Sequence, residues 1–260
     1  MQCRLCGGER LKLYYTQGND AQFKFYKCAE CGLVNYDLSG GLDQQKYADV
    51  YPDPFDDNNP ININQSLTFR FIQAHLNMTG KVLDIGCGNG RLLHLFKNAG
   101  WSTKGLELSP FMAQSIKDTL DIEVDTANFL EHHPADEGQN DLVILRHVLE
   151  HLPDPIRAMT KINAYLKPNR FAVLEFPNIE ALDLKLKRLL QRLKLYQKKY
   201  RANFTPGHCN EYCKRSFTYL ASKTGFELRV WETYSYKPFS NYIYNRLNIG
   251  NKARVILKKN

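Results

Sequence analysis

Residues 81–90 form a glycine-rich turn behind an apolar run, and they read Lys81-Val82-Leu83-Asp84-Ile85-Gly86-Cys87-Gly88-Asn89-Gly90. An apolar run that ends in an acid and then alternate glycines is typical of a buried parallel strand, a tight turn and the start of a helix. Glycine at every second position lets the backbone approach a ligand at points where any Cβ atom would collide. The pattern therefore predicts the nucleotide-facing turn of a Rossmann-like sheet.

The chain alternates strand and helix patterns around this turn. Apolar runs predict strands near 80–85, 102–107, 121–125, 140–146 and 170–176. Helical spacing fills the gaps at 64–76, 90–99, 110–119 and 154–166. A helix over 216–224 and strands over 226–236 and 253–258 complete the pattern. Such alternation predicts an α/β fold, in which helices cover both faces of a parallel sheet.

The spacing of the glycines bears on which cofactor binds. A dinucleotide turn reads G-x-G-x-x-G and places a pyrophosphate at the helix N-terminus. Here the turn reads G-x-G-x-G, and the Asp84 carboxylate beside it would repel a pyrophosphate but suits an ammonium group. S-Adenosylmethionine carries an ammonium and a sulfonium and no phosphate. Glu107, at the end of the second predicted strand, can accept hydrogen bonds from both ribose hydroxyls. The alternative for the glycine-rich turn is a turn that binds no ligand. The alternative for Glu107 is a solvated acid at a strand end.

Three features in this order resemble the class I S-adenosylmethionine-dependent methyltransferases: the 84–90 turn as motif I, Glu107, and the Leu-Glu-His-Leu and Asp-Pro run within 146–155. The resemblance covers about residues 65–235 and implies a Rossmann-like class I methyltransferase sheet with S-adenosylmethionine as cofactor. The residues it implies at the cofactor are Asp84, Gly86, Cys87, Gly88, Gly90, Glu107, Leu108, Asn128, Phe129 and Arg146. Asn128 departs from the family pattern, since an amide stands where an acid usually contacts adenine. The alternative for Phe129 is a position in the hydrophobic core.

Histidines supply the candidate catalytic residues. Methyl transfer needs a base only where the acceptor must lose a proton, and histidine titrates near neutral pH. His147 directly follows the fourth predicted strand and is the preferred base. His151 is a second candidate, and the alternative is that it has a structural role. His208, in a segment that corresponds to the family's Pro-Glu-His-Leu, is a further candidate. A metal held by His208, Cys209 and Cys213 is disfavoured because that set lacks a fourth ligand.

The first 38 residues carry two C-x-x-C pairs, each followed by glycine: Cys3 with Cys6, and Cys28 with Cys31. Four thiolates at this spacing predict a zinc ribbon, with zinc in a structural role because no ligand position is left open. The residues between the pairs alternate as short strands around a turn at 18–20. So small a module needs metal to fold. Disulfides or redox-active thiols are the alternative. With the ribbon included, the chain resembles the methyltransferase type 23/11 group and the N-terminal part of the nucleotide-sugar C-methyltransferases.

The net charge of +8 is concentrated in one segment. Residues 185–201 contain eight Lys and Arg residues and no acid. Leucines and tyrosines over 182–200 recur at steps of three and four, which predicts a basic amphipathic helix over 182–201 within an insertion at 180–205. Leu184 and Leu195 fall off the apolar face. Such a helix suits an anionic membrane surface. The alternative is a lid helix whose leucines cover the acceptor pocket and whose basic face is solvated.

The sequence predicts a zinc ribbon over 1–38, a linker over 39–63 that folds over the active site, and a methyltransferase domain over 64–260. No apolar run could cross a bilayer, and residues 1–6 lack the apolar region of a secretory signal. We therefore expect a cytoplasmic protein, with peripheral contact at the inner membrane surface as an extension of that prediction.

The predicted function is methyl transfer from S-adenosylmethionine to a sugar, a nucleotide-sugar or another anionic small-molecule or lipid-linked acceptor. One rival is an RNA methyltransferase that holds nucleic acid with the ribbon and the basic helix. The fourth strand lacks the Asn/Asp-Pro-Pro-aromatic motif and the Pro-Cys nucleophile of that class, so nucleic acid is disfavoured. The other rival is a non-catalytic interaction protein on a methyltransferase scaffold, against which the intact glycine turn and Glu107 argue.

Overall fold

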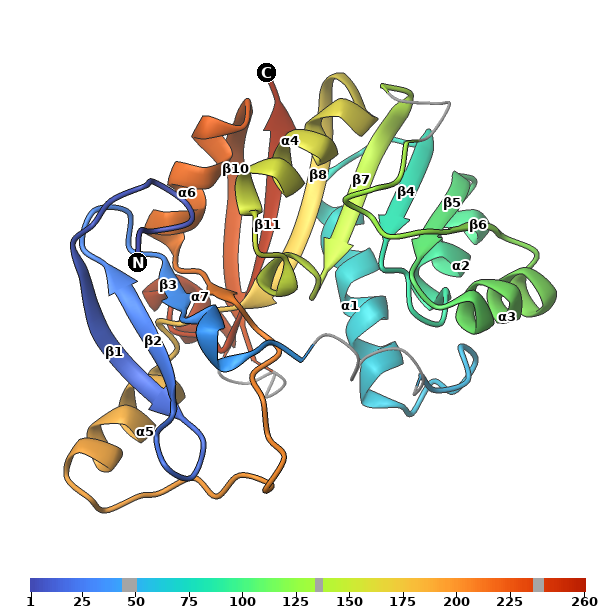
Figure 1. Ribbon diagram of the computed structural model, residues 1–260. Coiled ribbons are helices and arrows are strands. Elements are labelled where there is room, and N and C mark those ends of the chain that lie inside the picture. The colour runs from blue at the N-terminus through green and yellow to red at the C-terminus, as the bar shows by residue number, and fades with distance from the viewer. Residues whose placement is uncertain (44–50, 134–137, 236–240) are drawn as a thin grey trace. The chain divides into compact units, whose positions relative to one another are not determined.

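The computed structural model describes residues 1–43, 51–133, 138–235 and 241–260 (Figure 1). The chain divides into two compact units. The first combines Met1–Gln44, His147–Met159 and Glu175–Ile256, and the second combines Gln45–Arg146, Thr160–Leu174 and Leu257–Asn260. Each unit therefore takes residues from distant parts of the sequence. The domain division predicted from the sequence stays a prediction.

Seven strands form one sheet, which confirms the predicted Rossmann-like α/β class. Their order is β10 (Phe226–Tyr234), β11 (Lys252–Lys259), β8 (Leu166–Pro177), β7 (Asn140–Arg146), β4 (Lys81–Ile85), β5 (Ser102–Glu107) and β6 (Glu123–Thr126). β4 pairs in parallel with both β5 and β7, and β5 pairs in parallel with β6. The chain moves from β4 to β6 in one direction and returns on the other side at β7. In open α/β sheets, ligands bind at the carboxyl ends of strands beside such a reversal.

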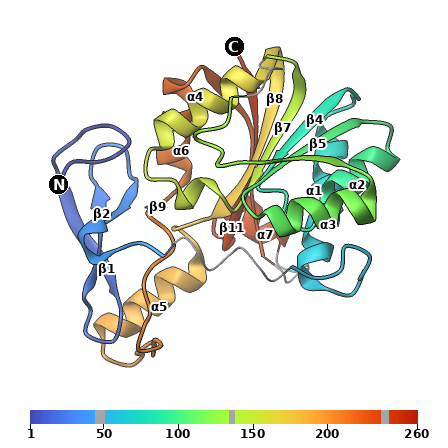
Figure 2. The same cartoon turned by 45° about the vertical axis from the view of Figure 1, so that its right-hand side comes forward.

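Three helices of the second unit lie beside β4 and β5 (Figure 2). They are α1 (Pro60–His75), α2 (Arg91–Asn98) and α3 (Pro110–Leu120). α2 packs against β4 and β5, α3 packs against β5 and β6, and α1 packs against α2. The start of α3 follows the sequence signal: the Ser109 side chain accepts a hydrogen bond from the Met112 N–H, and proline stands in the first turn.

Helix α1 begins earlier than the sequence analysis predicted. The predicted start was Asn64, but the helix starts at Pro60, and the Asn59 side chain caps it by accepting a hydrogen bond from the Ile61 N–H at 2.9 Å. Asn followed by Pro is a strong start signal, because the side chain satisfies a free N–H and proline needs none. The end of the predicted linker is therefore helical. Residues 44–50 of that linker, including Tyr47, lie outside the described residues.

The first unit contains a second, four-stranded sheet with the order β1-β2-β3-β9. Its strands are β1 (Leu11–Gln17), β2 (Phe23–Cys28), β3 (Val34–Tyr36) and β9 (Asn210–Glu211). β1 and β2 confirm the two short strands predicted between the cysteine pairs. β9 pairs antiparallel with β3, placing Glu211 opposite Val34. Buried Phe25 and Tyr36 of the ribbon share a core with Ile179 and Cys213, so later segments of this unit cover the ribbon.

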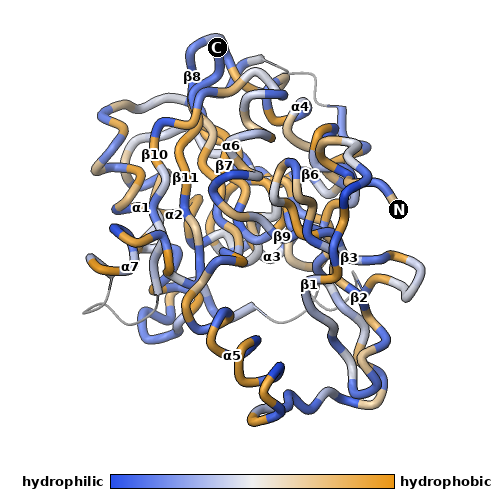
Figure 3. Tube along the Cα trace, turned by 90° about the vertical axis from the view of Figure 1, so that its left-hand side faces the viewer, coloured by the Kyte–Doolittle hydropathy of each residue, from blue (hydrophilic) through white to orange (hydrophobic). Residues whose placement is uncertain are grey.

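Helix α5 spans Leu182–Arg192, which is shorter than predicted (Figure 3). Lys194 has a φ of +58°, its N–H bonds to the Gln191 carbonyl at 3.0 Å, and the Leu195 N–H bonds to the Leu190 carbonyl at 2.9 Å. This pair of bonds is a Schellman motif, which ends a helix. The predicted helix over 193–201 is therefore wrong.

The predicted packing face of α5 is also wrong. Leu182, Leu186 and Leu189 are 50%, 53% and 52% exposed, so they cover no pocket. Leu184, predicted to lie off the packing face, instead packs against the ribbon core. Arg188, one turn later on the same side, donates to the Ile179 carbonyl at 3.0 Å. Leu184 and Arg188 thus hold the helix in place. The face that carries Leu182, Leu186 and Leu189 remains exposed. Peripheral membrane contact through residues 182–201 stays a prediction.

The remaining elements are η1 (Leu38–Gly40), η3 (Leu149–His151), α4 (Pro155–Tyr165), α6 (Lys214–Lys223) and α7 (Asn241–Leu247). Of the helices in the described ranges, none is long and apolar enough to cross a membrane. Tyr236, the predicted end of the strand that begins at Phe226, lies outside the described residues.

Candidate active site

The glycine-rich turn between β4 and α2 has the backbone conformation that the sequence requires. Gly86, Gly88 and Gly90 have φ values of +72°, +58° and +74°, a left-handed region that other residues adopt at a cost. A Cβ atom on Gly90 would lie 2.9 Å from side-chain carbons of Ile116 and Leu120, so α3 packs directly on the turn. Both the conformation and the close packing exclude larger residues here.

Glu107 lies against this turn. Its Oε2 accepts a hydrogen bond from the Gly88 N–H at 3.0 Å. Its Oε1 accepts from the N–H groups of Leu108 at 2.8 Å and Ser109 at 3.1 Å. Three backbone donors therefore fix the carboxylate at the end of β5. Each carboxylate oxygen has more than one acceptor site, so the group can still accept from ribose hydroxyls.

The remaining residues of the predicted turn site divide into buried and exposed groups. Asp84, at the end of β4, is 3% exposed, and its carboxylate suits the ammonium of a bound cofactor. Cys87 is buried, and burial raises the pKa of its thiol. Leu108 is 63% exposed and can cover a ligand. Left-handed glycines, a buried acid and a fixed Glu107 together fit S-adenosylmethionine.

Part of the predicted linker covers the turn. A Cβ atom on Gly88 would lie 2.6 Å from the Tyr51 ring, so this ring packs on the turn. The Asn89 side chain donates to the Pro52 carbonyl at 2.9 Å, and Arg91 donates to the Pro54 carbonyl at 2.7 Å. These contacts agree with the prediction that the linker folds over the site. The sequence signal for this cover is Arg91, directly after the last glycine of the turn, because its side chain binds the covering segment.

Buried amides hold α1 against the same turn. The Gln65 side chain donates to the Asn89 Oδ1 at 3.0 Å and accepts from the Leu92 N–H at 2.9 Å. The Asn89 side chain donates to the Asn62 Oδ1 at 2.9 Å. Because buried polar groups are costly unless paired, this network fixes one arrangement of the turn.

The predicted adenine contacts lie after β6. The Asn128 side chain accepts from the Leu130 N–H at 3.0 Å, as in a local turn. Phe129 is 6% exposed, and its ring centre lies 6.2 Å from that of Tyr165, which makes it part of the core. Arg146 is half-buried at the end of β7. The roles of these residues at the cofactor stay predictions.

His147 follows Arg146 directly and lies in the first unit. It has a φ of +56°, which is uncommon for a residue other than glycine. Its Nδ1 lies 3.3 Å from the Glu150 Oε1, and its Nε2 lies 3.0 Å from the Lys252 Nζ. The ammonium can only donate, so Nε2 accepts and Nδ1 donates to the carboxylate. Both ring nitrogens are thus engaged by protein groups.

His151 and His208 meet around the buried Glu150. The two imidazole rings are perpendicular, with centres 4.7 Å apart, and the His151 Nδ1 lies 2.7 Å from the Gly207 carbonyl. Glu150 is 1% exposed, and its Oε2 has no hydrogen-bond partner among the described residues. Ligand atoms of these three residues lie within 4.8 Å of one another, so they could also hold a metal ion. His208 with Cys209 and Cys213, the set that the sequence disfavours, is not such a group among the described residues.

Electrostatics set the protonation states in this group. Burial alone would raise the Glu150 pKa, but the hydrogen bond from His147 and the three nearby histidines lower it. Burial lowers the pKa of His208, and the Glu150 charge offsets this only in part. The structure therefore places a neutral imidazole beside an ionised carboxylate near neutral pH, which is the arrangement of a general base.

Glu211, on β9, is a second buried acid in this unit. Burial raises its pKa from 4.5 to about 7, although a hydrogen bond from Tyr15 opposes the shift. A raised pKa means that the folded protein holds the proton more tightly than the unfolded chain. The stabilisation from this group is full below the unfolded pKa and is lost as the pH rises through about 7.

We expect Glu211→Gln to stabilise the protein at about pH 8 by an amount on the order of 3 kcal/mol, and to have little effect at about pH 4. The amide removes the cost of a buried charge and can still accept from Tyr15. Thermal melting at both pH values measures the difference. Glu227→Gln is the matched control, since Glu227 is half exposed and paired with Arg229. Equal melting shifts for the two variants would contradict the assignment.

The four cysteines of the ribbon converge as predicted, with sulfur atoms within 4.8 Å of one another. The Cys3 and Cys31 sulfurs are 3.5 Å apart, and those of Cys6 and Cys28 are 3.6 Å apart. Zinc–sulfur bonds of about 2.3 Å in a tetrahedron separate the sulfurs by about 3.8 Å. The Leu33 N–H points at the Cys31 sulfur at 3.5 Å. Spacing, donor type and this outer hydrogen bond fit a structural zinc site.

Comparison with known proteins agrees with this geometry. The model of a family described as a methyltransferase domain matches residues 62–230. The ubiquinone biosynthesis O-methyltransferases of Paraburkholderia xenovorans and Haemophilus ducreyi are 32% and 29% identical to the chain over 136 residues. These matches cover 48% of this chain and 57% and 58% of those relatives. The chain thus matches less than two thirds of the length of either relative.

Solved structures show the same fold. A protein from Pyrococcus horikoshii has a TM-score of 0.58 at 17% identity, covering 81% of this chain and 97% of that one. A structure described as a SAM dependent methyltransferase from Archaeoglobus fulgidus has a TM-score of 0.54 at 19% identity, covering 75% of this chain and 94% of that one.

Proposed function

Since the chain belongs to this methyltransferase-domain family, we propose that it transfers a methyl group from S-adenosylmethionine to a hydroxyl group of an anionic small molecule, such as a sugar or nucleotide-sugar. The observation that carries the acceptor chemistry is the pair of His151 and His208 around the ionised Glu150. A hydroxyl must lose its proton on methylation, and this group can take it. The O-methyltransferase names of the relatives support oxygen as the accepting atom.

Residues of the second unit hold the cofactor in this proposal. Glu107 accepts from the ribose hydroxyls, Asp84 faces the ammonium, and the left-handed glycines admit the cofactor close to the backbone. When bound, S-adenosylmethionine supplies a methyl group on a sulfonium, which is a good leaving group. The protein's main contribution is then alignment of the reacting groups.

Glu150 and the histidines around it take up the proton in this proposal. On methylation the acceptor hydroxyl would lose its proton, and the His208 imidazole would take it. Glu150 stabilises the imidazolium that results. His147, held between Glu150 and Lys252, is a positioning residue for that carboxylate rather than the base, which revises the preference drawn from the sequence.

The activity is tested by incubating the protein with S-adenosylmethionine and a panel of sugars, nucleotide-sugars and phenolic acids. We expect S-adenosylhomocysteine to form together with a methyl ether, identified by mass spectrometry and acid stability. A product methylated on nitrogen or carbon would overturn the assignment of oxygen. Turnover on an RNA panel alone would favour the rival RNA methyltransferase.

We expect His208→Gln to lower kcat by about a hundredfold or more with little change in KM for S-adenosylmethionine. The variant keeps the size of the side chain but cannot accept the proton. His133→Gln is the matched control, since His133 is exposed in the second unit. The rate of the parent protein should fall at low pH as His208 becomes protonated, and the variant should lose this dependence. An unchanged pH profile in the variant would exclude His208 as the base.

A further inference from the structure

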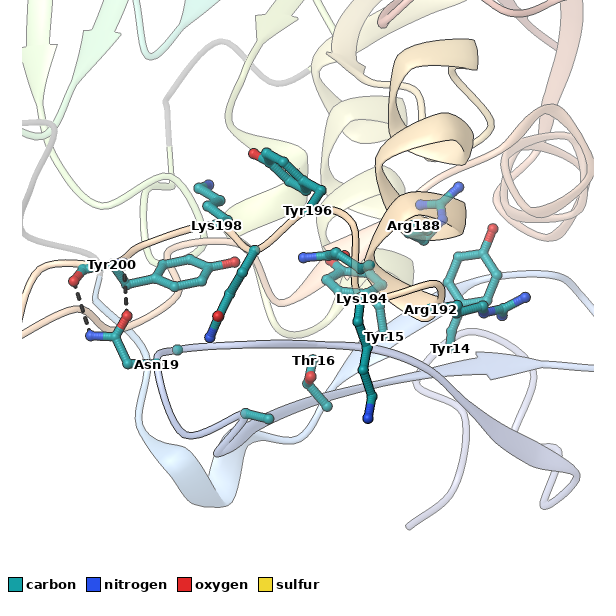
Figure 4. Close-up of a pocket in the computed structure, with 14 residues that line it drawn as sticks. Tyr14, Tyr15, Thr16, Asn19, Arg188, Arg192, Lys194, Tyr196, Lys198 and Tyr200 are labelled. Carbon is teal, nitrogen blue, oxygen red and sulfur yellow. Dashed lines mark hydrogen bonds between the residues drawn. The ribbon is translucent and has the colours of Figure 1, made fainter.

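A pocket of about 500 Å³ lies in the first unit between the ribbon and the basic segment (Figure 4). One wall is formed by β1 and the turn that follows it, with Tyr14, Tyr15 and Asn19. The other wall is formed by the end of α5 and the chain up to Tyr200. A pocket of this volume is in the range that holds small molecules.

The charge of this pocket is one-sided. Four cations line it, namely Arg188, Arg192, Lys194 and Lys198, and no acid stands among the described lining residues. Clustered cations without acids repel one another, and an anion in their midst relieves that repulsion. Arginine and lysine are the usual donors to phosphate oxygens, because their hydrogen bonds are charge-assisted.

The pocket also offers aromatic surface. Its lining includes Tyr14, Tyr15, Tyr196 and Tyr200. The Arg188 guanidinium lies 4.6 Å from the centre of the Tyr14 ring, and the Lys198 ammonium lies 4.9 Å from that of Tyr200. Tyrosine faces bind planar or sugar rings, and the paired cations can reach phosphates joined to such a ring.

Specific contacts fix both walls, so the pocket is built rather than incidental. The Asn19 side chain accepts from the Tyr200 N–H at 2.9 Å and donates to the Tyr200 carbonyl at 3.0 Å. Phe204 anchors the same stretch, with ring centres 4.5 Å from Tyr200 and 5.8 Å from Phe23 of the ribbon. The Schellman motif at Lys194 turns the chain from α5 into this wall. A preformed site loses less entropy on binding.

We propose that this pocket binds a diphosphate ester that carries a ring, with the diphosphate on Arg192, Lys194 and Lys198 and the ring on the tyrosines. The ester can come from a free nucleotide or from a lipid-linked diphosphate. This binding site goes beyond the proposed methyl transfer, because it requires no cofactor and no reaction. It also gives the ribbon a role, since the ribbon supplies one wall.

Calorimetry on the full chain without S-adenosylmethionine tests the proposal, with UDP, pyrophosphate and uridine as probes. We expect UDP to bind more tightly than pyrophosphate or uridine. We also expect the affinity for UDP to fall as salt is added. Neutral vesicles containing a polyprenyl diphosphate sugar, which carries both the diphosphate and a ring, form the lipid arm, and they show which source is preferred. Arg192→Gln combined with Lys194→Gln should weaken the preferred diphosphate about tenfold to a hundredfold.

Lys187→Gln combined with Lys199→Gln is the matched control, because it removes the same charge outside the pocket. We expect it to change affinity less than about twofold, because exposed charges outside the pocket contribute little. Equal losses in both double variants would overturn the proposal, and so would the absence of diphosphate binding. Binding of plain phosphatidylglycerol vesicles or oligouridylate in place of the diphosphates would overturn it in favour of a membrane or RNA surface. Melting curves of all variants confirm that they fold, and S-adenosylmethionine binding is measured separately.

Discussion

Gly88→Val should reduce the affinity for S-adenosylmethionine at least about a hundredfold. Gly88 has a φ of +58°, where a β-branched residue is strained, and its Cβ would lie 2.6 Å from the Tyr51 ring. The backbone beside the ring is held, because the Pro52 carbonyl accepts a hydrogen bond from Asn89. The Gly88 N–H also donates to Glu107, so a displaced turn releases the carboxylate that we propose accepts from the ribose hydroxyls. Calorimetry with S-adenosylhomocysteine measures the loss.

Gly100→Val is the control for this variant. Gly100 also has a positive φ, of +83°, but a Cβ atom there would meet nothing within 4 Å. It therefore carries the same backbone strain without the collision at the turn. Glu107→Gln serves as a second variant if Gly88→Val fails to fold, since it keeps the shape of the side chain and removes the charge. Unchanged affinity in both Gly88→Val and Glu107→Gln would remove the cofactor assignment.

The parallel sheet could be predicted because its signals are local and repeated. Each apolar run of the Rossmann pattern is long enough to mark a strand, and each ends near a turn residue or a helix cap. The turn at Gly86 to Gly90 was predicted for the same reason, since only glycine suits its backbone. The convergence of Cys3 with Cys31 could be predicted from spacing alone, because two C-x-x-C pairs, each followed by glycine, are typical of a site in which four thiolates bind one metal ion.

The errors arise where contacts distant in sequence decide the structure. β9 has two residues, too few for a periodic signal, and it is a strand only because β3 lies beside it. Helix α5 ends at a Schellman motif formed by Lys194, where the usual glycine signal is absent. The prediction chose the wrong packing face because most leucines of the helix lie on the other face. Among the described residues of α5, Leu184 is the leucine that packs against the ribbon core.

The histidine site shows a similar limit. Chain order favoured His147 as the base, because it follows β7 directly. The hydrogen bonds of His147 to Glu150 and Lys252 depend on the tertiary fold, and no local pattern reveals them. The pairing of His151 with His208 likewise joins segments far apart in the sequence. The sequence could supply the candidate histidines, and the roles proposed for them rest on contacts that only the fold reveals.

Removal of zinc should unfold the ribbon sheet and lower the stability of the first unit by an amount on the order of 10 kcal/mol. The sulfur atoms of Cys3, Cys6, Cys28 and Cys31 are the point where the chain before β1 meets the end of β2. Without metal, too little apolar surface remains to hold these strands together. The effect should extend to β9, because Arg4 donates to the Asn210 side chain at 3.0 Å and to the Tyr36 carbonyl at 2.9 Å.

Metal analysis of the purified protein should therefore find about one zinc ion per chain. Cys28→Ser should bind no zinc, and hydrogen exchange should show lost protection in β2, β3 and β9 while β4 and β5 keep theirs. Cys209→Ser is the matched control, since that buried thiol lies outside the cluster and a hydroxyl can replace its bond to the Glu150 carbonyl. A protein that retains protection in β2 and β3 after complete chelation would show that the ribbon is held by its packing against Ile179 and Cys213, and that the four thiols are not a structural metal site.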